Sequence, residues 1–196
     1  MRLDFRHACF LTSAAALDGL PPDTGREAAF AGRSNAGKSS ALNAVTGVSG
    51  LARVSKTPGR TRLLNLFEVV PGMRFVDLPG YGYAKVPQAE RARWAALLEG
   101  YLENRECLMG LGLVMDARHP MSEFDRQLLA YAAPLQLPVH VLLSKADKLG
   151  RGAAQKSLAE TKRALRGWGS AQLFSAHSGE GVEEAQKKLS EWLAGA

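Results

Sequence analysis

The chain has 196 residues, of which 46% are hydrophobic and 22% are charged. A chain of this length buries roughly 70% of its unfolded surface, so it can form a full core without metal or disulfide cross-links. This composition argues against wholesale disorder, collagen and coiled coil. No apolar run approaches the roughly 20 residues that a membrane span needs, and no secretory signal is expected at the N-terminus.

The charge balance is basic, because 25 Lys and Arg residues exceed 19 Asp and Glu residues and give a net charge of +6. Two interpretations stay open: a solvated basic surface, or a polyanionic partner such as RNA or DNA. The two cysteines, Cys9 and Cys107, have no metal-ligand spacing. We therefore expect a reduced, cytoplasmic protein in which both thiols are buried.

Short apolar runs predict six strands, at residues 27–32, 63–70, 73–78, 111–116, 139–144 and 171–175. Helical patterns lie between them, at residues 38–45, 88–105, 123–133, 153–168 and 182–193. Only Pro71 and Gly72 separate the second strand from the third, so this pair is predicted to be an antiparallel hairpin. The sequence therefore predicts an α/β fold with three layers (α/β/α), whose six-stranded sheet is mostly parallel with one antiparallel strand.

The first predicted strand runs directly into G-R-S-N-A-G-K-S, which matches the phosphate-binding pattern G-x-x-x-x-G-K-S/T. Glycines let the backbone wrap an anion closely, and consecutive N–H groups then point at the phosphates. The positive N-terminal end of the next helix adds to this attraction. Lys38 is predicted to reach the β- and γ-phosphates and Ser39 to bind Mg²⁺. The alternative is a glycine-rich turn with a surface lysine.

The tetrapeptide D-L-P-G follows the hairpin, at Asp77 to Gly80. The pattern D-x-x-G is common by chance, and its position at the end of a strand is what makes it informative. There, Asp77 would hold the hydration shell of Mg²⁺, and the N–H of Gly80 would meet the γ-phosphate. The alternative is an aspartate that caps a turn.

The segment S-K-A-D ends a later strand, with Asp147 as its last residue. A carboxylate there can accept hydrogen bonds from both N1–H and N2–H₂ of guanine, a donor pair that adenine lacks. The stem of Lys145 would lie over the base plane, and Ser175 and Ala176 would complete the base pocket. The alternative is a helix-initiating turn with solvated charges.

The segment V-S-K-T-P-G-R-T-R, residues 54–62, has no apolar periodicity and contains two threonines. Thr61 is preferred over Thr57 as a Mg²⁺ ligand because it lies nearer to the next strand. A loop ordered by Mg²⁺ and γ-phosphate is a nucleotide switch. Arg60 and Arg62 flank this threonine, and if the switch presents them to RNA, binding would depend on the nucleotide state and fall steeply with salt. The alternative is a plain surface loop.

Four segments together resemble the EngB family of bacterial ribosome-biogenesis GTP-binding proteins: G-R-S-N-A-G-K-S-S, K-T-P-G-R-T, D-L-P-G-Y-G-Y-A and S-K-A-D-K. The resemblance runs from about Phe10 through Trp192. It implies a single P-loop GTPase domain at residues 25–196, preceded by an extension at residues 1–24 that packs on it. It also implies a cytoplasmic monomer that acts with rRNA and ribosomal proteins in assembly of the large ribosomal subunit, and that is needed for cell division and septation.

The resemblance further implies the residues that contact GTP or GDP. Mg²⁺ would be bound directly by Ser39 and Thr61 and through water by Asp77. Ser144 departs from the threonine that is usual in the family, but it keeps a hydroxyl. The nucleotide contacts implied are Gly32, Arg33, Ser34, Asn35, Ala36, Gly37, Lys38, Ser39, Gly59, Arg60, Thr61, Arg62, Leu63, Asp77, Leu78, Pro79, Gly80, Ser144, Lys145, Ala146, Asp147, Phe174, Ser175 and Ala176.

Catalysis is assigned to Lys38 and Thr61. Tyr81 stands where many GTPases carry a glutamine that orients the attacking water. We therefore expect slow intrinsic hydrolysis, accelerated by a partner or a cation. Asn35 occupies the place of a K⁺-coordinating asparagine, and the alternative is that it only shapes the loop. Two other function classes stay open: a P-loop kinase acting on a small molecule, and a GTP-stabilised interaction module that does not hydrolyse.

Overall fold

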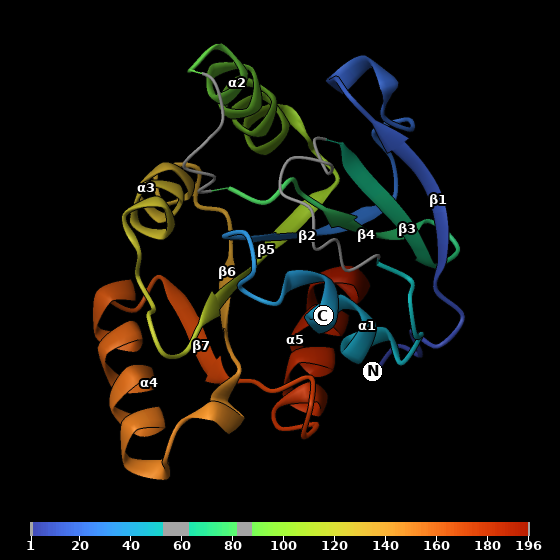
Figure 1. Ribbon diagram of the computed structural model, residues 1–196. Helices are drawn as coiled ribbons and strands as arrows, with labels where there is room; N and C mark the ends of the chain where they lie inside the picture. The colour runs from blue at the N-terminus through green and yellow to red at the C-terminus, as the bar shows by residue number, and fades with distance from the viewer. Residues whose placement is uncertain (1, 53–62, 82–87, 196) are drawn as a thin grey trace.

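The computed structural model describes residues 2–52, 63–81 and 88–195. One sheet of seven strands lies between two layers of helices (Figure 1). The strands are β1 (Cys9–Ala14), β2 (Arg26–Gly32), β3 (Leu64–Val70), β4 (Met73–Asp77), β5 (Leu108–Asp116), β6 (Val139–Ser144) and β7 (Gly169–Leu173). The helices are α1 (Lys38–Thr46), α2 (Gln88–Asn104), α3 (Glu123–Ala132), α4 (Arg151–Leu165) and α5 (Val182–Ala194), with short 3₁₀ turns η1 (Leu17–Gly19) and η2 (Ala146–Lys148).

The strand order is β1-β3-β4-β2-β5-β6-β7. β3 pairs antiparallel with both of its neighbours, and the pairs from β4 to β7 are all parallel. The predicted α/β fold class, with one strand running against the rest, is confirmed. The predicted number of strands is wrong, because the N-terminal segment adds β1 as a seventh.

β1 is an edge strand, and its residues lack the alternation that marks a half-buried strand. Phe10 and Leu11 are both exposed, and the register with β3 shifts between Phe10 and Thr12. The side chains of Ser13 and Asn65 are joined by a hydrogen bond of 2.7 Å across the pair. Pairing with a partner some fifty residues away leaves little trace in the local pattern. The division into an extension at residues 1–24 and a domain at residues 25–196 stays a prediction.

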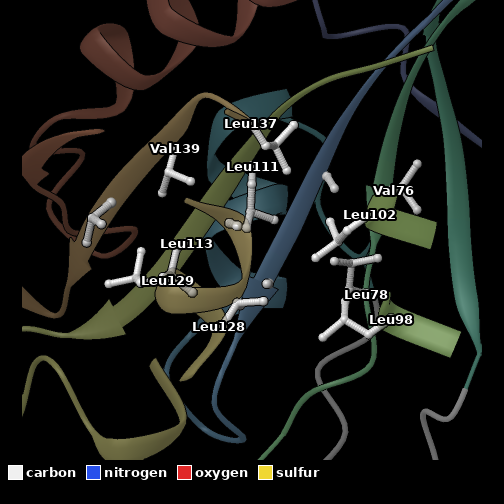
Figure 2. Packing of buried hydrophobic residues seen from close by; sticks show 14 of the residues in the cluster. Val76, Leu78, Leu98, Leu102, Leu111, Leu113, Leu128, Leu129, Leu137 and Val139 are labelled. Atoms are coloured by element: carbon white, nitrogen blue, oxygen red, sulfur yellow. The ribbon is translucent and has the colours of Figure 1, made fainter. Parts of the chain in front are cut away.

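The core consists of two clusters, one on each face of the sheet. On one face, α2, α3 and α4 pack against the sheet and contribute Leu98, Leu129 and Leu165 to the cluster. Figure 2 shows part of this packing. On the other face, α1 and α5 pack with the N-terminal residue Phe5. Successive residues of β2 alternate between the two clusters, so Ala29 faces one and Phe30 the other. This alternation is the period of two that a strand imposes.

β5 begins at Leu108, three residues earlier than predicted. The prediction missed these residues because Gly110 interrupts the apolar pattern, and a second glycine, Gly112, follows. A Cβ at Gly110 would lie 2.5 Å from the ring of Trp192 on α5, and a Cβ at Gly112 would lie 3.4 Å from Phe30. The glycines therefore let α5 and β2 approach this strand closely. The other predicted strands and helices match the observed ones to within a few residues.

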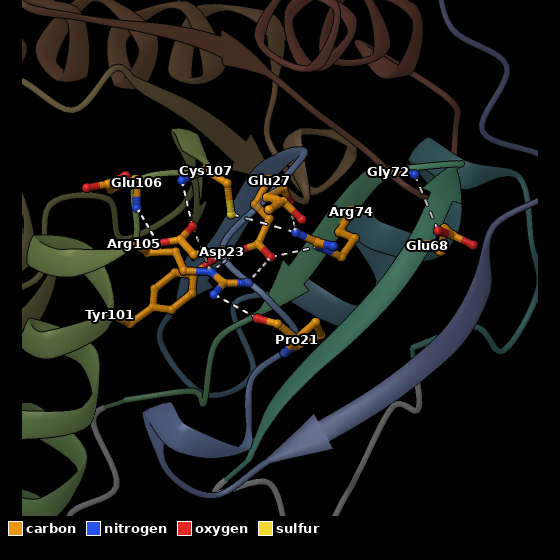
Figure 3. Close-up of polar contacts among 11 residues, drawn as sticks. Pro21, Asp23, Glu27, Glu68, Gly72, Arg74, Tyr101, Arg105, Glu106 and Cys107 are labelled. Atoms are coloured by element: carbon orange, nitrogen blue, oxygen red, sulfur yellow. Dashed lines mark hydrogen bonds and ion pairs between the residues drawn. The ribbon is translucent and has the colours of Figure 1, made fainter.

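A buried ionic cluster joins the start of β2 to β4 and α2 (Figure 3). Glu27 is fully buried and accepts hydrogen bonds from Arg74 at 2.8 Å, from Arg105 at 2.7 Å and from the Tyr101 hydroxyl at 2.9 Å. Burial alone would raise the pKa of Glu27, but Arg105 and the other partners lower it below its ordinary value. Glu27 therefore keeps its charge, as a paired buried carboxylate must.

The cysteines differ in their surroundings. Cys107 is buried, as predicted, whereas the prediction is wrong for Cys9, which is exposed on the edge strand β1. Burial raises the pKa of the Cys107 thiol to about 12, so that group is unreactive. Over the described ranges, no helix combines the length and the apolar character needed to cross a membrane.

Candidate nucleotide-binding site

The described segments predicted to bind nucleotide lie at or just beyond the carboxyl ends of strands β2, β4, β6 and β7. β2 leads into the P-loop, β4 ends at Asp77, β6 ends at Ser144, and β7 is followed by Ser175. Because these strands run parallel, their carboxyl ends meet at one edge of the sheet, which is where α/β proteins bind ligands. The fold therefore places distant motifs together.

The P-loop, residues 33–37, turns tightly between β2 and α1. Asn35 and Gly37 both have left-handed backbone conformations, with φ of 63° and 97°. Ala36 N donates to Arg33 O at 2.9 Å and closes the turn. A Cβ on Gly32, at the end of β2, would lie 2.6 Å from the carbonyl oxygen of Val114. Alternation of left-handed residues with ordinary ones points successive N–H groups into one concave surface, the form of an anion-binding nest.

Lys38, the first residue of α1, forms a buried ion pair with Asp77 at the end of β4. The predicted phosphate-binding ammonium and the predicted Mg²⁺-side carboxylate therefore lie in direct contact, brought together by the neighbouring strands β2 and β4. Each satisfies the other's charge in a site where both are nearly buried. Both groups lie beside the P-loop, Lys38 at the start of α1 and Asp77 at the end of β4.

Ser144 and Lys145 tie the end of β6 to the P-loop. The Ser144 hydroxyl contacts the carbonyl oxygen of Ala36 and lies 3.1 Å from that of Met115. The Lys145 ammonium donates to the carbonyl oxygen of Asn35 at 2.6 Å. The departure from threonine at position 144 leaves this hydroxyl contact in place, because it needs only the oxygen.

Asp116 is a site residue for which the sequence suggested no role. Its carboxylate accepts from the Lys145 ammonium at 3.0 Å and from Arg118 at 2.7 Å. Burial alone would raise the pKa of Asp116, but hydrogen bonds from Arg118 and Lys145 lower it well below its ordinary value. Asp116 therefore orients Lys145 as a permanent anion. The only signal in the sequence is its position at the carboxyl end of a strand.

Asp147 and Ser175 are in contact within the predicted base pocket. The Ser175 hydroxyl donates to Asp147 Oδ1 at 2.7 Å, and this bond is the main cause of the lowered pKa of Asp147. Ala146 N donates to Phe174 O at 3.1 Å, which joins the two loops through their backbones. Phe174 and Ser175 are fully buried, and Ala176 is exposed. An ionised, oriented carboxylate is what recognition of two guanine donors needs.

The segment from Leu78 to Tyr81 runs along β2 onto the P-loop. Leu78 N donates to Phe30 O at 2.9 Å, and Ser34 N donates to Tyr81 O at 2.8 Å. Leu78 and Pro79 are buried, and the side chain of Tyr81 is only 4% exposed. Gly80 lies against the P-loop, since a Cβ on it would be 3.7 Å from Ser34 N.

Part of the predicted site lies outside the described residues. Gly59, Arg60, Thr61 and Arg62 belong to the undescribed range 53–62, so the predicted Mg²⁺ ligand Thr61 stays a prediction. Leu63, which follows that range, is exposed.

Two oxygen-bearing side chains among the described residues fit a bound Mg²⁺ ion. The hydroxyl of Ser39 and the carboxylate of Asp77 are the hard oxygen ligands that this ion prefers. Ser39 follows Lys38 in the first turn of α1, and Lys38 contacts Asp77 at the end of β4. Mg²⁺ usually takes one or two such protein ligands together with phosphate oxygens. Bound there, it would neutralise phosphate charge.

Sequence comparisons identify relatives along nearly the whole chain. Residues 27–145 match the family model described as "50S ribosome-binding GTPase". A protein of Coxiella burnetii (strain RSA 331 / Henzerling II) named "Probable GTP-binding protein EngB" is 52% identical over 192 residues, covering 96% of this chain and 94% of that one. A protein of Photobacterium profundum with the same name is 49% identical over 194 residues, covering 97% and 83%.

Structure comparisons agree on the fold. A crystal structure described as "a probable GTP-binding protein engB" matches with a TM-score of 0.71 at 22% identity, covering 87% of this chain and 100% of that one. The structure of Aquifex aeolicus Era bound to GDP and AlF₄⁻ matches with a TM-score of 0.69 at 23% identity, covering 87% and 57%. With the matches in sequence, these results show that the chain belongs to the EngB family of GTP-binding P-loop GTPases.

Proposed function

We propose that this protein is a nucleotide switch that binds GTP and GDP with Mg²⁺, hydrolyses GTP slowly, and acts in assembly of the large ribosomal subunit. The observation that carries the proposal is the meeting of Lys38 and Asp77 beside a P-loop to which Lys145 is bound. Lys38 and Asp77 would serve phosphate and Mg²⁺, and Lys145 would serve the base. GTPase family membership removes the small-molecule kinase that the sequence left open.

In this proposal, Lys38 neutralises the β- and γ-phosphates and the P-loop N–H groups surround them. Ser39 and Thr61 bind Mg²⁺ directly, and Asp77 binds it through water. Asp147 accepts from the two guanine donors, and Lys145 lies over the base. The remaining contacts come from the segments at 32–37, 59–63, 78–80 and 174–176 named above.

Slow intrinsic hydrolysis is proposed because Tyr81 has no amide to orient water, and its hydroxyl is already bound to Asp125 at 2.7 Å. A K⁺ ion beside Asn35, or a partner, would supply the missing charge stabilisation. Thr61 and Lys38 are the residues proposed to act at the transferred phosphate.

The ribosomal partner is proposed from the description of the matching family, "50S ribosome-binding GTPase", and from the net charge of +6. A basic surface suits rRNA, since phosphate contacts dominate the affinity of proteins for nucleic acids. A monomer in the cytoplasm and a role in cell division and septation belong to the same proposal.

The proposed function predicts a switch in base preference when Asp147 is changed to Asn. Guanine offers N1–H and N2–H₂, whereas xanthine offers N1–H and a carbonyl oxygen at C2. Asp147→Asn should therefore lose at least about 100-fold in GDP affinity and gain affinity for xanthosine diphosphate, because an amide can both accept and donate. Fluorescence titration with GDP, GTP, ATP and xanthosine diphosphate, with Mg²⁺ and K⁺ present, measures this.

The matched control is Asp23→Asn, just before β2 and at the opposite end of that strand from the P-loop. Asp23 accepts from the backbone N–H groups of Glu106 and Cys107, so its substitution should leave nucleotide preference unchanged. Equal affinity of the wild type for ATP and GTP would contradict the proposed function.

A further inference from the structure

The side chain of Tyr81 is bound to helix α3. Its hydroxyl donates to Asp125 Oδ1 at 2.7 Å, and its ring lies against that of Phe124 with the centroids 6.2 Å apart. Burial, and then the negative charge of Asp125, raise the pKa of the Tyr81 hydroxyl well above its ordinary value. The phenol therefore stays protonated, and the hydrogen bond persists across the neutral pH range.

Asp125 has two separate tasks, one for each carboxylate oxygen. Oδ2 accepts from Ser122 N at 2.8 Å, and the Ser122 hydroxyl oxygen accepts from Asp125 N at 3.3 Å, which together form the capping box at the start of α3. The Ser122 hydroxyl also donates to Oδ2 at 2.7 Å. Of the two carboxylate oxygens, the capping box uses only Oδ2. Oδ1 is left for Tyr81, and Asp125 is only 3% exposed. The helix cap therefore also holds the residue that follows the D-x-x-G motif.

The backbone of Tyr81 is fixed on the other side by the P-loop. Its carbonyl oxygen accepts from Ser34 N at 2.8 Å, and a short parallel bridge pairs it with Arg33. Asp77, at the other end of the segment, contacts Lys38. Segment 77–81 is thus held between two rigid elements, with its side-chain anchor on α3 and its backbone anchor on the P-loop.

This docked position occupies two donors beside the P-loop, one of them the ammonium proposed to bind the β- and γ-phosphates. The Tyr81 carbonyl occupies the Ser34 N–H, and the Asp77 carboxylate occupies the Lys38 ammonium. The Tyr81 carbonyl and the Asp77 carboxylate are both hydrogen-bond acceptors, and both would face the additional negative charge of a γ-phosphate. Binding of a triphosphate therefore competes with docking of segment 77–81 more strongly than binding of a diphosphate does.

We propose that Asp125 is a positioning residue that, through its hydrogen bond to Tyr81, holds segment 77–81 on the P-loop and so favours nucleoside diphosphate over triphosphate. This role rests on the proposed function, since it concerns the same site. It also makes the first turn of α3, with the half-exposed ring of Phe124, the part of the surface that responds to the nucleotide.

The test compares Tyr81→Phe with Tyr101→Phe in the full chain. Both tyrosines are buried and donate to a carboxylate, Tyr81 to Asp125 at 2.7 Å and Tyr101 to Glu27 at 2.9 Å. The ratio of the Kd for a non-hydrolysable GTP analogue to the Kd for GDP is measured with Mg²⁺ present. Loss of one hydrogen bond to a charged group should lower this ratio about five- to tenfold in Tyr81→Phe. Tyr101→Phe should lose stability with an unchanged ratio.

A second pair of variants separates positioning from helix capping. Asp125→Ala should lower the ratio as Tyr81→Phe does, and the double variant should lower it no further. Ser122→Ala removes the serine hydroxyl from the cap and from Oδ2 but leaves the bond between Tyr81 and Oδ1, so it should lose stability and keep the wild-type ratio. An unchanged ratio in Tyr81→Phe, or an equal fall in Tyr101→Phe, overturns the positioning role. A wild type that binds neither nucleotide overturns the proposed function itself, and the positioning role with it.

Discussion

Two side chains at the end of β6 connect the proposed base-recognition segment to the phosphate loop. Ser144 contacts the carbonyl oxygen of Ala36, and Lys145 donates to that of Asn35. Lys145 itself sits in a left-handed conformation, with φ of 59°. The two halves of the proposed site therefore cannot move independently. Loss of base contacts is expected to loosen the P-loop, in addition to removing hydrogen bonds to the base.

Asn35 provides a test at the scale of one residue, because its backbone and its side chain can be separated. Its φ of 63° suits Asn or Gly and strains Ala. If the side-chain amide binds K⁺, Asn35→Gly should keep the loop but lose stimulation of hydrolysis by K⁺ over Na⁺. We expect clear stimulation in the wild type and equal rates in the two salts for Asn35→Gly, measured by single-turnover phosphate release.

Asn35→Ala is the companion variant, because it lacks the amide and also strains the backbone. It should lose K⁺ stimulation and also bind GDP more weakly than Asn35→Gly does. Retained stimulation in Asn35→Gly would mean that Asn35 only shapes the loop.

At the scale of elements, the contact between β6 and β7 depends on a buried histidine. His140 Nε2 lies 2.8 Å from Gln172 Oε1, and Nδ1 lies 2.7 Å from the Ser170 hydroxyl. The amide nitrogen of Gln172 donates to the carbonyl oxygen of Gly181, just before α5. The amide oxygen must then accept from Nε2–H, which leaves Nδ1 to accept from Ser170. A neutral imidazole in this tautomer satisfies both contacts.

His140 makes the free energy of unfolding of the protein depend on pH. Burial lowers the pKa of His140 below its ordinary value, and the bond to Gln172 opposes this only in part. Below about pH 6.5, the unfolded chain takes up a proton that the folded chain resists, so the free energy of unfolding falls as the pH falls. Urea unfolding at pH 7.5 and pH 5.5 should show a larger loss in the wild type than in His140→Gln. Equal losses would contradict this.

At the scale of the whole molecule, sequence patterns predicted most of the elements because their signals are local. β6 is buried throughout and has the bounds expected of it, and α1 begins at Lys38 as predicted. β7 lies two residues earlier than predicted, because Phe174 and Ser175 are buried in a loop and not in a strand.

The features that the sequence did not predict all depend on partners distant along the chain. β1 becomes a strand by pairing with β3, and its own residues remain largely exposed. Asp116 acquires its role from Lys145, and Asp125 from Tyr81. In each case a residue with an ordinary local setting is given its task by tertiary contact, which a pattern along one chain does not reveal. The nucleotide motifs could be predicted because their chemistry is carried by contiguous residues.

The arrangement of the sheet separates stability from ligand binding. Glu27 lies at the start of β2, whereas the P-loop follows the end of the same strand, so the ionic cluster of Figure 3 and the proposed site lie at opposite ends. Changing Glu27 to Gln leaves Arg74 and Arg105 with no carboxylate at this position. We expect the free energy of unfolding to fall by about 3–5 kcal/mol, while the Kd for GDP stays within about twofold of the wild type.

Urea denaturation with and without saturating GDP measures both quantities on one sample. Because GDP stabilises the folded state according to its concentration and its Kd, the added stability should be the same in both proteins. Glu68→Gln on β3 is the matched control, since within the described part of the chain its carboxylate accepts only a long hydrogen bond of 3.4 Å from Gly72 N. That variant should change stability by less than about 0.5 kcal/mol. A large loss of GDP affinity in Glu27→Gln would show instead that the two ends of β2 are coupled, because a rigid strand would then transmit the disturbance to the P-loop.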